Sequence, residues 1–484
     1  MLYSLLALVP LVALLLLSLW RGLNVAIGVS FLLTVGLFFV WQAPVGQLWV
    51  SLLAAVFSTL TILMIVLGAL FLYRVMEGTG YVEGLSTSLR GVHPDREIHF
   101  FLMVIGLTPF FEGVAGFGTP GAIVPLLLIA LGYDAALAVS AVLLMNGLVG
   151  LAGAVGTPVL TGFEVPLGLD SAEVRGIYVR AAVLHAVYGA VVLGFIIRAY
   201  QRGADALQHR RSVWLMYAFY AGALLLFSAV AGPYSLILAA IAMLGLSALV
   251  LRRGREPLDL RPWVPYAVLV GLLLLPRLVA PLRRVVEWEW RWPGAFGTDH
   301  DVAFSPLAVP LLPFVAVGLG VMVVRKSRRW YARELAQKIG SMALILFPAV
   351  ALSQLMVNSD GPRPSMVAHL AGLLERTGPL YVFFAPLLGV LGTFITGSTT
   401  VSNLIFGAAQ QQTAQTLRLD EPLILALQLC GAALGNAVSL FNIIAAATVA
   451  NVADYRPILR QNLVPILVVG LVAGLGGWVL LRLG

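Results

Sequence analysis

The segment from Pro109 to Pro125 places one carboxylate, Glu112, and four glycines inside a run that is otherwise apolar. Glycine and proline interrupt a helix and leave backbone N–H and C=O groups without partners. Each such group is costly in the hydrocarbon of a bilayer, so a broken helix persists there only where protein covers it or where it lines a polar cavity. We therefore predict that Glu112 lies in a site at membrane depth.

The composition indicates an all-α polytopic membrane protein. Of 484 residues, 60% are hydrophobic and 11% are charged, and the mean hydropathy is +0.97, whereas roughly 25% of the residues in a soluble chain are charged. The net charge of +8 comes almost entirely from arginine, in short clusters between apolar runs. This pattern is typical of loops at the cytoplasmic leaflet of a lipid bilayer and does not indicate nucleic-acid binding. A single cysteine, Cys430, excludes an internal disulfide.

Windows of about 20 residues, the length of a membrane-crossing helix, predict about 12 transmembrane helices plus two re-entrant helical hairpins. The hairpins are predicted at about 99–130 and 379–416, where glycine, proline and threonine interrupt runs too long for one crossing. The simple spans are predicted at 2–19, 23–41, 50–73, 135–160, 177–197, 213–231, 233–251, 263–280, 302–324, 339–357, 423–450 and 461–482.

Arginine clusters set the predicted orientation. The loops at 198–211, 252–261 and 325–333 are separated from one another by two spans each, so all three can be cytoplasmic. Tracing the remaining spans from these loops places both termini outside. The tryptophan-rich segment at 288–292 then lies outside as well, as an interfacial aromatic collar.

The same trace predicts two repeats of inverted topology, because the hairpin at 99–130 enters from the cytoplasm and the one at 379–416 enters from outside. Inverted repeats with broken helices that meet near mid-membrane are the construction of secondary transporters. The first repeat covers 1–200, a linking helix pair covers 201–261, and the second repeat covers 262–484. Amphipathic segments at 82–92 and 367–377 precede the hairpins. A faint match at a steady offset near 285 pairs Val82, Leu85, Leu89, Gly113, Asp134 and Leu137 with Val367, Leu370, Leu374, Gly397, Asp420 and Leu423.

Polar residues gather at the interruption of each hairpin and on one later segment. Five hydroxyls and Asn403 surround Gly397, and the N-terminus of a broken helix adds free N–H groups that bind anions. Asn436, Ser439 and Asn442 recur at three-residue spacing on one helix face, where they either line the substrate path or bond between helices. The predicted substrate-binding residues are Gly113, Gly116, Gly118, Thr119, Thr396, Ser398, Thr399, Thr400, Ser402, Asn403, Asn436 and Asn442.

Histidines give weaker signals. His185 lies in an apolar run and is either a hydrogen-bonded packing residue or a second proton-coupling candidate after Glu112. His93 and His99 flank a polar loop and are predicted to lie on the solvated surface. The sequence has no His and Cys cluster with zinc spacing and no nucleotide-binding lysine after a glycine-rich loop, so we predict no metal site, no cofactor and no enzymatic activity.

Two motifs resemble the bacterial L-lactate permease family, which includes glycolate permeases. They are FFEGVAGFGTP at 110–120, followed by GTP at 156–158, and GTFITGSTTVSN at 392–403, followed by QTAQ at 412–415. The resemblance spans nearly the whole chain and implies a proton-coupled importer of small 2-hydroxymonocarboxylates in the bacterial cytoplasmic membrane, related to a wider ion-transporter superfamily. Thr399 stands where many relatives carry an acid, and Asn436 where some carry a lysine.

We therefore expect a secondary active transporter that imports L-lactate or glycolate with a proton through elevator-type alternating access. Sodium coupling is the alternative. An anion channel is a third interpretation, which is less favoured because a channel would not need two hairpins with unlike polar residues. Glu112 is the predicted proton-coupling residue because desolvation favours the neutral form of a carboxyl group, which can then donate a hydrogen bond to an anionic substrate. The competing interpretation is that Glu112 caps the broken helix by accepting backbone N–H bonds. A homodimer is one candidate assembly.

Overall fold

The structure is a computed structural model that describes every residue except 1, 22, 82–83, 85–91, 117, 165–166, 168, 204–205, 233–234, 254–258, 287, 308, 310, 375–377, 379 and 484. The elements of the first half are α1 (Leu2–Trp20), α2 (Leu23–Val40), α3 (Val45–Gly78), α5 (Arg96–Leu102), η1 (Met103–Leu107), α6 (Thr108–Ala115), α7 (Thr119–Ala130), α8 (Ala135–Val149), η2 (Gly150–Ala152), α9 (Gly153–Val159), η3 (Leu160–Glu164), α11 (Ser171–Gly203), α12 (Arg210–Ala231) and α13 (Ser235–Leu251).

The remaining elements are again helical except for one short β-hairpin, in which β1 pairs antiparallel with β2 and Arg291 lies opposite Ala303. They are η5 (Arg261–Trp263), α14 (Val264–Leu278), α15 (Ala280–Val286), β1 (Trp290–Trp292), η6 (Ala295–Gly297), β2 (Val302–Phe304), α16 (Leu311–Val324), α17 (Ala332–Val357), α18 (Met366–Leu374), α19 (Tyr381–Thr396), α20 (Thr399–Leu417), α21 (Glu421–Gly435), α22 (Leu440–Val449) and α23 (Arg456–Leu483).

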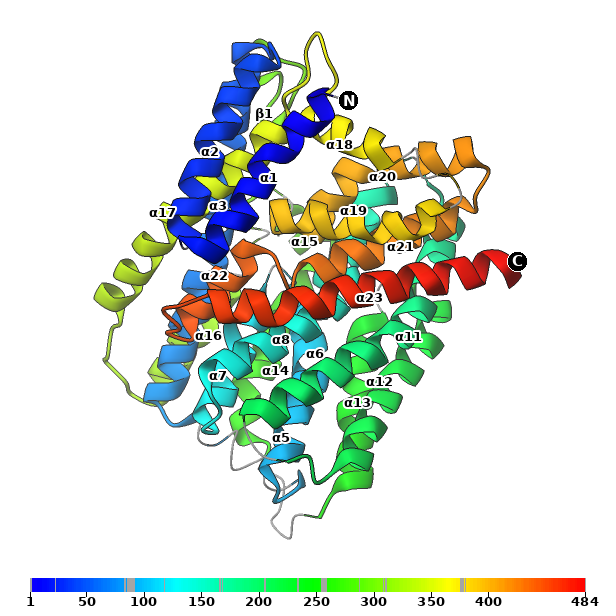
Figure 1. The fold of residues 1–484 in the computed structure, drawn as a ribbon. Helices are drawn as coiled ribbons and strands as arrows, with labels where there is room; N and C mark the ends of the chain where they lie inside the picture. Colours follow the sequence, from blue (N-terminus) through cyan, green and yellow to red (C-terminus); the bar gives the residue numbers. More distant parts are fainter. Residues whose placement is uncertain are drawn as a thin grey trace.

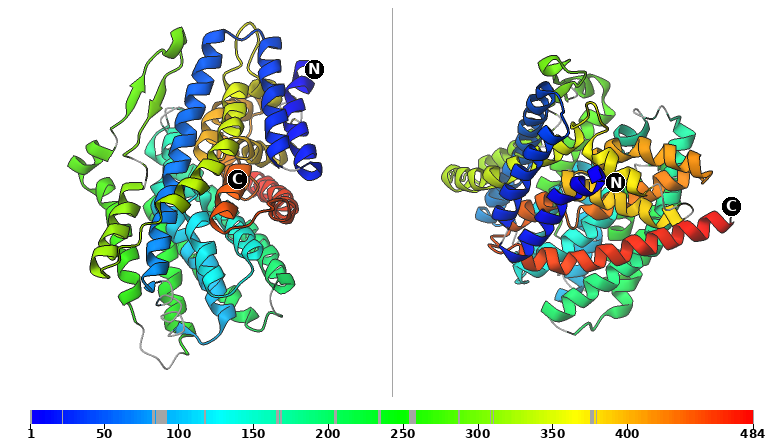
Figure 2. Two further views of the ribbon diagram at one scale, coloured as in Figure 1. Left: turned by 90° about the vertical axis from the view of Figure 1, so that its left-hand side faces the viewer. Right: turned by 45° about the horizontal axis from the view of Figure 1, so that its top comes forward.

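The helices form two packed groups. The scaffold group consists of α1, α2, α3, α16 and α17, which pack on one another along the left side of Figure 1. The core group consists of α6 to α9 and α19 to α22, with α11 and α23 packed against it. Figure 2 shows α23, in red, running along the outside of this group. The linking helices α12 and α13 pack on each other and on α11 and α6.

The centre of the core group is made by α8 and α21. Every residue from Leu137 to Val149 and from Leu423 to Gly435 is buried. Apart from Ser140, Asn146 and Gln428, these stretches are apolar around the helix circumference, and helices of that kind are stable only when other helices or lipid surround them. Outer helices instead present large apolar side chains, such as Leu226 and Leu471, on the exterior, as expected of surfaces that face lipid.

The fold is that of an all-α polytopic membrane protein. Five helical segments of the described chain are long and apolar enough to cross a bilayer: Ala135–Ala152, Ala172–Gly203, Arg210–Ala231, Glu421–Val449 and Arg456–Arg482. Shorter apolar helices accompany them, including Leu2–Leu14, Val25–Val40 and Tyr381–Thr396.

The structure refines three of the predicted spans. The runs 135–160 and 423–450 contain apolar segments long enough to cross a bilayer, but each is interrupted, at Gly150–Gly153 and at Asn436–Ser439. Hydropathy cannot reveal these breaks because the small residues that permit them are themselves apolar or weakly polar. The run 302–324 begins as β2, and its helix α16 starts only at Leu311.

The segment 82–92 lies almost entirely outside the described residues, whereas 367–374 belongs to α18. The loop before α18 is fixed to the scaffold group, because Trp41 Nε1 donates to Pro364 O at 3.1 Å and the Arg363 guanidinium lies 4.5 Å from the centroid of the Tyr3 ring. α18 also packs on α1. The second hairpin is thus connected to the scaffold through α18.

His93 and His99 are buried, so their predicted place on the solvated surface is wrong. His99 Nε2 lies 2.6 Å from His93 O, and His93 Nδ1 accepts the Asp95 N–H at 3.1 Å. Nearby, the Glu97 carboxylate accepts the backbone N–H groups of Gln208 and His209 at 2.8 and 2.7 Å. The loop before α12 is therefore bonded to the start of the first hairpin, which buries residues that look like loop residues in sequence.

Candidate functional site

The first hairpin is interrupted by two glycines. α6 ends at Ala115, and Gly116 follows with φ 61° and ψ −150°, a conformation open essentially only to glycine. Gly118 is left-handed, with φ 78°, and begins α7 without a side-chain cap. In the first turn of α7 the Thr119 N–H is bonded to Gly116 O at 2.9 Å and Pro120 has no N–H, so Gly121 is the residue of this turn that can offer an N–H to a ligand.

The second hairpin is interrupted by one glycine. Gly397, with φ 72°, ends α19, and Ser398 begins α20 as its N-cap by accepting the Val401 N–H at 3.3 Å. A Cβ at position 397 would lie 2.6 Å from Cδ2 of Phe441 on α22. Gly113, paired with Gly397 in the sequence match, lies instead inside α6 and packs against Ile237. These two glycines do not share a local structure.

Two further breaks follow the hairpins, and they have the same construction. Gly153 (φ −56°, ψ 154°) separates η2 from α9, and Ser439, which lies 286 positions later, has φ −60° and ψ 127° before α22. The preceding helices α8 and α21 are both capped by aspartate, since Asp134 accepts the Leu137 N–H and Asp420 accepts the Leu423 N–H.

The four breaks surround one cavity of about 220 Å³. The core group lines it through the hairpin tips, including Glu112, Gly118 and Ser398, and through both broken helices that follow. The scaffold group closes it with α3 and α17. Among its described lining residues, Glu112 is the only ionisable one, and none is lysine, arginine or histidine. The remaining lining residues are Ser58, Thr61, Gly121, Leu143, Asn146, Gly150, Gly153, Thr157, Pro158, Val350, Gln354, Thr396, Gly397, Thr399, Thr400, Val401, Asn436, Asn442 and Ala445.

Three helices of eight or more residues begin beside this cavity. The lining includes Gly118 and Gly121 from the start of α7, Ser398 and Thr399 from the start of α20, and Asn442 from the first turn of α22. Each helix N-terminus carries roughly half a positive charge. The wall is therefore electropositive although it has no cationic side chain.

Glu112 is 5% exposed, and no described residue donates a hydrogen bond to its Oε2. Its Oε1 lies against the backbone of Gly153, where a Cβ would be 2.1 Å away. At the break, the Gly116 N–H donates to the backbone O of Glu112 at 2.8 Å and not to its side chain. Within the described residues the side chain is thus not a helix cap, and it is available to a proton or a ligand.

A hydrogen-bonded chain of polar residues forms one wall of the cavity. Asn442 Nδ2 donates to Asn436 Oδ1 at 3.0 Å, Asn436 Nδ2 donates to Thr399 Oγ1 at 2.9 Å, and Thr399 Oγ1 lies 3.4 Å from Ala432 O. Because the helix breaks between Asn436 and Asn442, these residues and Ser439 do not share a helix face, and that prediction is wrong. The break itself brings Asn436 and Asn442 together.

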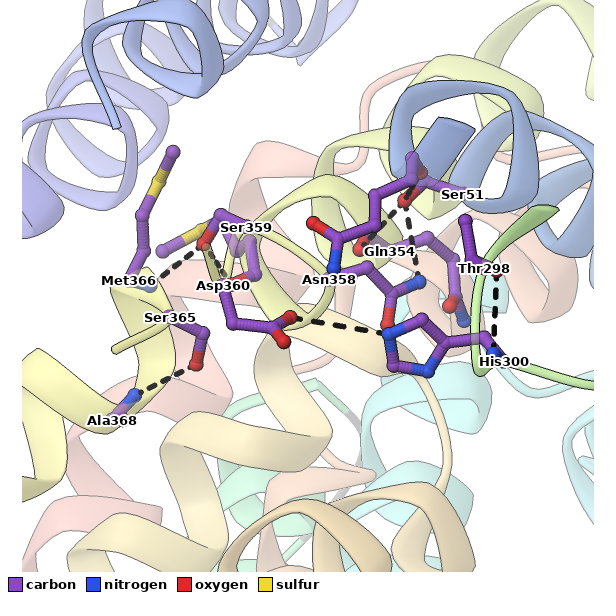
Figure 3. Close-up of polar contacts among 12 residues, drawn as sticks. Ser51, Thr298, His300, Gln354, Asn358, Ser359, Asp360, Ser365, Met366 and Ala368 are labelled. Atoms are coloured by element: carbon purple, nitrogen blue, oxygen red, sulfur yellow. Dashed lines mark hydrogen bonds and ion pairs between the residues drawn. The ribbon is translucent and has the colours of Figure 1, made fainter. Parts of the chain in front are cut away.

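Polar contacts in the scaffold group fix the end of α17 beyond the cavity (Figure 3). Asn358 Nδ2 donates to Ser51 Oγ at 3.2 Å, which ties α17 to α3 one turn after the cavity-lining Gln354. Nearby, His300 Nε2 lies 3.9 Å from Asp360 Oδ1, and Ser359 Oγ accepts the Met366 N–H at 2.7 Å. The scaffold wall of the cavity is therefore held from outside the core group.

Comparison with known proteins agrees with this architecture. A family model described as L-lactate permease matches residues 3–258 and 308–484. The chain belongs to the L-lactate permease family. It is 26% identical over 482 residues to a putative L-lactate permease of Haemophilus influenzae, with 90% of this chain and 89% of that protein covered. It is 26% identical over 512 residues to the L-lactate permease of Escherichia coli K12, with 93% and 91% covered, and 24% identical over 480 residues to the glycolate permease of the same strain, with 86% and 84% covered.

In this member of the L-lactate permease family, the structure gathers eight of the predicted site residues around the cavity. They are Glu112, Gly118, Thr396, Ser398, Thr399, Thr400, Asn436 and Asn442. Six others lie outside its lining: Gly113, Gly116, Thr119, Ser402, Asn403 and His185. Gly116 still shapes the site because it supplies the break before α7.

Ser402 and Asn403 bond within the core group. Asn403 Nδ2 donates to Pro158 O at 2.9 Å, and Ser402 Oγ donates to Gly389 O at 2.9 Å. Gln428 joins them, since its Nε2 donates to Asn403 Oδ1 at 3.3 Å and its Oε1 accepts from Gln410 Nε2 at 2.8 Å. Asn403 thus holds α20 against Pro158, which does line the cavity.

His185 is fully buried on α11, and its Nε2 lies 3.0 Å from Tyr220 Oη on α12. It is separated from the cavity lining, and Arg180 on the same helix instead pairs with Asp420 at 3.1 Å. The described residues hold no cluster of three or more His, Cys, Asp or Glu residues that could bind a metal ion.

Sequence reasoning missed several lining residues, among them Asn146, Thr157, Gln354, Ser58 and Thr61. Each lies in a largely apolar run, and such residues usually bond to their own helix, as Thr61 does to Phe57 O at 2.9 Å. For Asn146 a signal existed: an amide cannot be satisfied by its own helix as simply as a hydroxyl, so an isolated Asn in a span points to a partner or a ligand.

Proposed function

We propose that this chain is a secondary active transporter that imports small 2-hydroxymonocarboxylates, L-lactate or glycolate, by proton symport. The observation that carries the proposal is the convergence of three helix N-termini and one unpartnered carboxyl group, Glu112, on a cavity whose described lining holds no cationic side chain. The names of the relatives, L-lactate and glycolate permeases, support the substrate class.

The electrostatics of the cavity supports coupling to a proton. Helix N-termini favour an anion, and two or three of them can bind a carboxylate without a lysine or arginine. An ionised Glu112 in the same small cavity would repel that carboxylate by about 4 kcal/mol at a separation of about 4 Å and an effective dielectric of about 20. This corresponds to roughly a thousandfold loss of affinity. Substrate binding therefore requires a neutral Glu112, and each anion enters with one proton.

The interface between the two helix groups supports an elevator-type motion. Leu14, Ile27 and Leu352 of the scaffold face Phe394, Leu440 and Phe441 of the core across a small gap. An apolar interface of this kind can slide without breaking directional bonds. Within the scaffold, in contrast, the Arg74 guanidinium on α3 pairs with Glu334 on α17 at 2.5 Å, which favours movement of the scaffold as one body.

The inverted repeat belongs to the same proposal. The paired breaks at Gly153 and Ser439, and the paired caps Asp134 and Asp420, support two halves built alike around one site. We propose residues 1–200 and 262–484 as the halves, 201–261 as the linking pair, and both termini outside. The scaffold group and the core group then each contain parts of both halves, as expected for alternating access.

Uptake into proteoliposomes tests the function. We expect labelled L-lactate to accumulate against its gradient when the outside is acidified, with saturable kinetics. Accumulation driven by an imposed sodium gradient at equal pH would instead favour sodium coupling. Flux that never exceeds equilibration and does not saturate would favour an anion channel and overturn the proposal.

A further inference from the structure

Asn146 differs from three other buried asparagines, two in the core group and one on α23, which packs against it. Asn403, Asn436 and Asn462 each have both amide atoms engaged: Asn462 Oδ1, for example, accepts from Ser140 Oγ at 2.5 Å while its Nδ2 donates to Ala437 O at 2.8 Å. Asn146 is 2% exposed, and its Oδ1 has no hydrogen-bond partner among the described residues. A buried acceptor without a donor is costly and calls for a ligand or a water to complete it.

The location of Asn146 indicates that a substrate in the cavity can be the missing partner. It lies on α8 one turn before the break, and its backbone O already accepts the Gly150 N–H. Its carboxamide lines the cavity that also holds Glu112. The polar chain of Asn442, Asn436 and Thr399, which lies against Gly150, is bonded within itself, because its side-chain donors bond to one another and to Ala432 O.

We propose that Asn146 is the specificity-determining residue that accepts the hydrogen bond of the substrate's 2-hydroxyl group. This inference rests on the proposed function. The helix N-termini provide hydrogen-bond donors for the substrate carboxylate. The carboxylate has no proton to donate, so only another group of the substrate can donate a hydrogen bond to the unpartnered Asn146 Oδ1. In a 2-hydroxymonocarboxylate that group is the hydroxyl, and an acid without it leaves the buried acceptor unpaired.

The test compares L-lactate with propionate, the same acid without the hydroxyl, in proteoliposomes. The KM for L-lactate uptake and the inhibition constant of propionate are measured in wild type and in Asn146→Leu, which keeps the side-chain size. We expect the affinity for L-lactate to fall about 5- to 150-fold while the constant for propionate stays within about twofold, so that the preference for the hydroxyl disappears.

Asn462→Leu is the matched control, because it removes a buried asparagine that is fully partnered and lies outside the cavity lining. We expect it to change both constants by the same factor. If Asn146→Leu is not recovered folded, Asn146→Ala gives the same comparison without steric strain.

An unchanged ratio of the two constants in the Asn146 variants, or an equal loss for both acids, would overturn the assignment. Wild-type protein that accumulates no L-lactate would overturn the proposed function instead. The two failures are therefore distinguishable in one experiment.

Discussion

Glu112 Oε1 lies in a niche that exists because residue 153 is glycine. A methyl group at position 153 would be 2.1 Å from this oxygen and would overlap it. The two residues belong to different parts of the core group, the first hairpin and the broken helix after it. Their contact therefore couples the position of the carboxyl group to the geometry of the break.

Gly153→Ala should displace the Glu112 side chain without removing it. Because Gly153 has a negative φ, alanine is compatible with its backbone, and the effect comes from the clash alone. We expect proton-driven uptake of L-lactate to fall roughly 10- to 100-fold, as is typical of a displacement of about 1 Å at a reacting group. Gly194→Ala on α11 is the control, since no atom lies within 4 Å of its Cβ, and normal expression with unchanged uptake in both variants would contradict the prediction.

Glu112→Gln should separate transport from coupling. Glutamine imitates the neutral acid in shape and in hydrogen bonding, so the variant can still load and move the substrate. We expect loss of accumulation against a gradient, with exchange of labelled for unlabelled L-lactate partly retained and independent of pH. Measuring exchange and pH-driven uptake on the same proteoliposomes checks this. Accumulation with normal pH dependence would show that another group carries the proton.

Crosslinking the two helix groups should stop transport. Leu352 on α17 and Phe441 on α22 line the same small gap between the two groups, so we choose these positions for a cysteine pair. We expect oxidation to abolish uptake and reduction to restore it. Ser51→Cys with Asn358→Cys, a pair within the scaffold joined now by a 3.2 Å hydrogen bond, should crosslink without loss of activity. Cys430 is buried and gives little background. Full transport in the crosslinked interface variant would rule out relative motion of the groups.

The contact between the first hairpin and the loop before α12 should weaken in acid. Burial lowers the pKa of His93, and the neighbouring charge of His209 lowers it further against the opposing effect of Asp95. The unfolded histidine, with a pKa of about 6.5, then binds protons more tightly than the folded one, so stability is lost as the pH falls below about 6.5. Protonation of His93 Nδ1 also removes the bond from the Asp95 N–H.

The melting temperature of the solubilised protein, measured between about pH 7 and about pH 5.5, checks this prediction. Wild type should lose stability more steeply than His93→Gln, which cannot titrate. His300→Gln, at a half-buried histidine in the loop before β2, is the matched control and should follow wild type. Parallel curves for wild type and His93→Gln would show that His93 does not contribute.

Sequence alone determined the class of protein and the position of its most important interruptions. A run with the hydropathy of a membrane span and the glycines of FFEGVAGFGTP has few folds open to it, because the bilayer leaves no partner for free backbone groups. For this reason the breaks at Gly116 and Gly397 and the cavity around Glu112 follow from local composition.

Only the tertiary structure decided which polar side chains face the cavity. Asn403 donates to Pro158 O, 245 positions away, and His185 lies beside Tyr220, whereas Gln354 lines the cavity although nothing near it in sequence is unusual. Whether an amide side chain bonds to a carbonyl or lines a cavity depends on which helix lies beside it, and that is set by the packing of the whole chain. Sequence periodicity reports the face of a helix but not what that face meets.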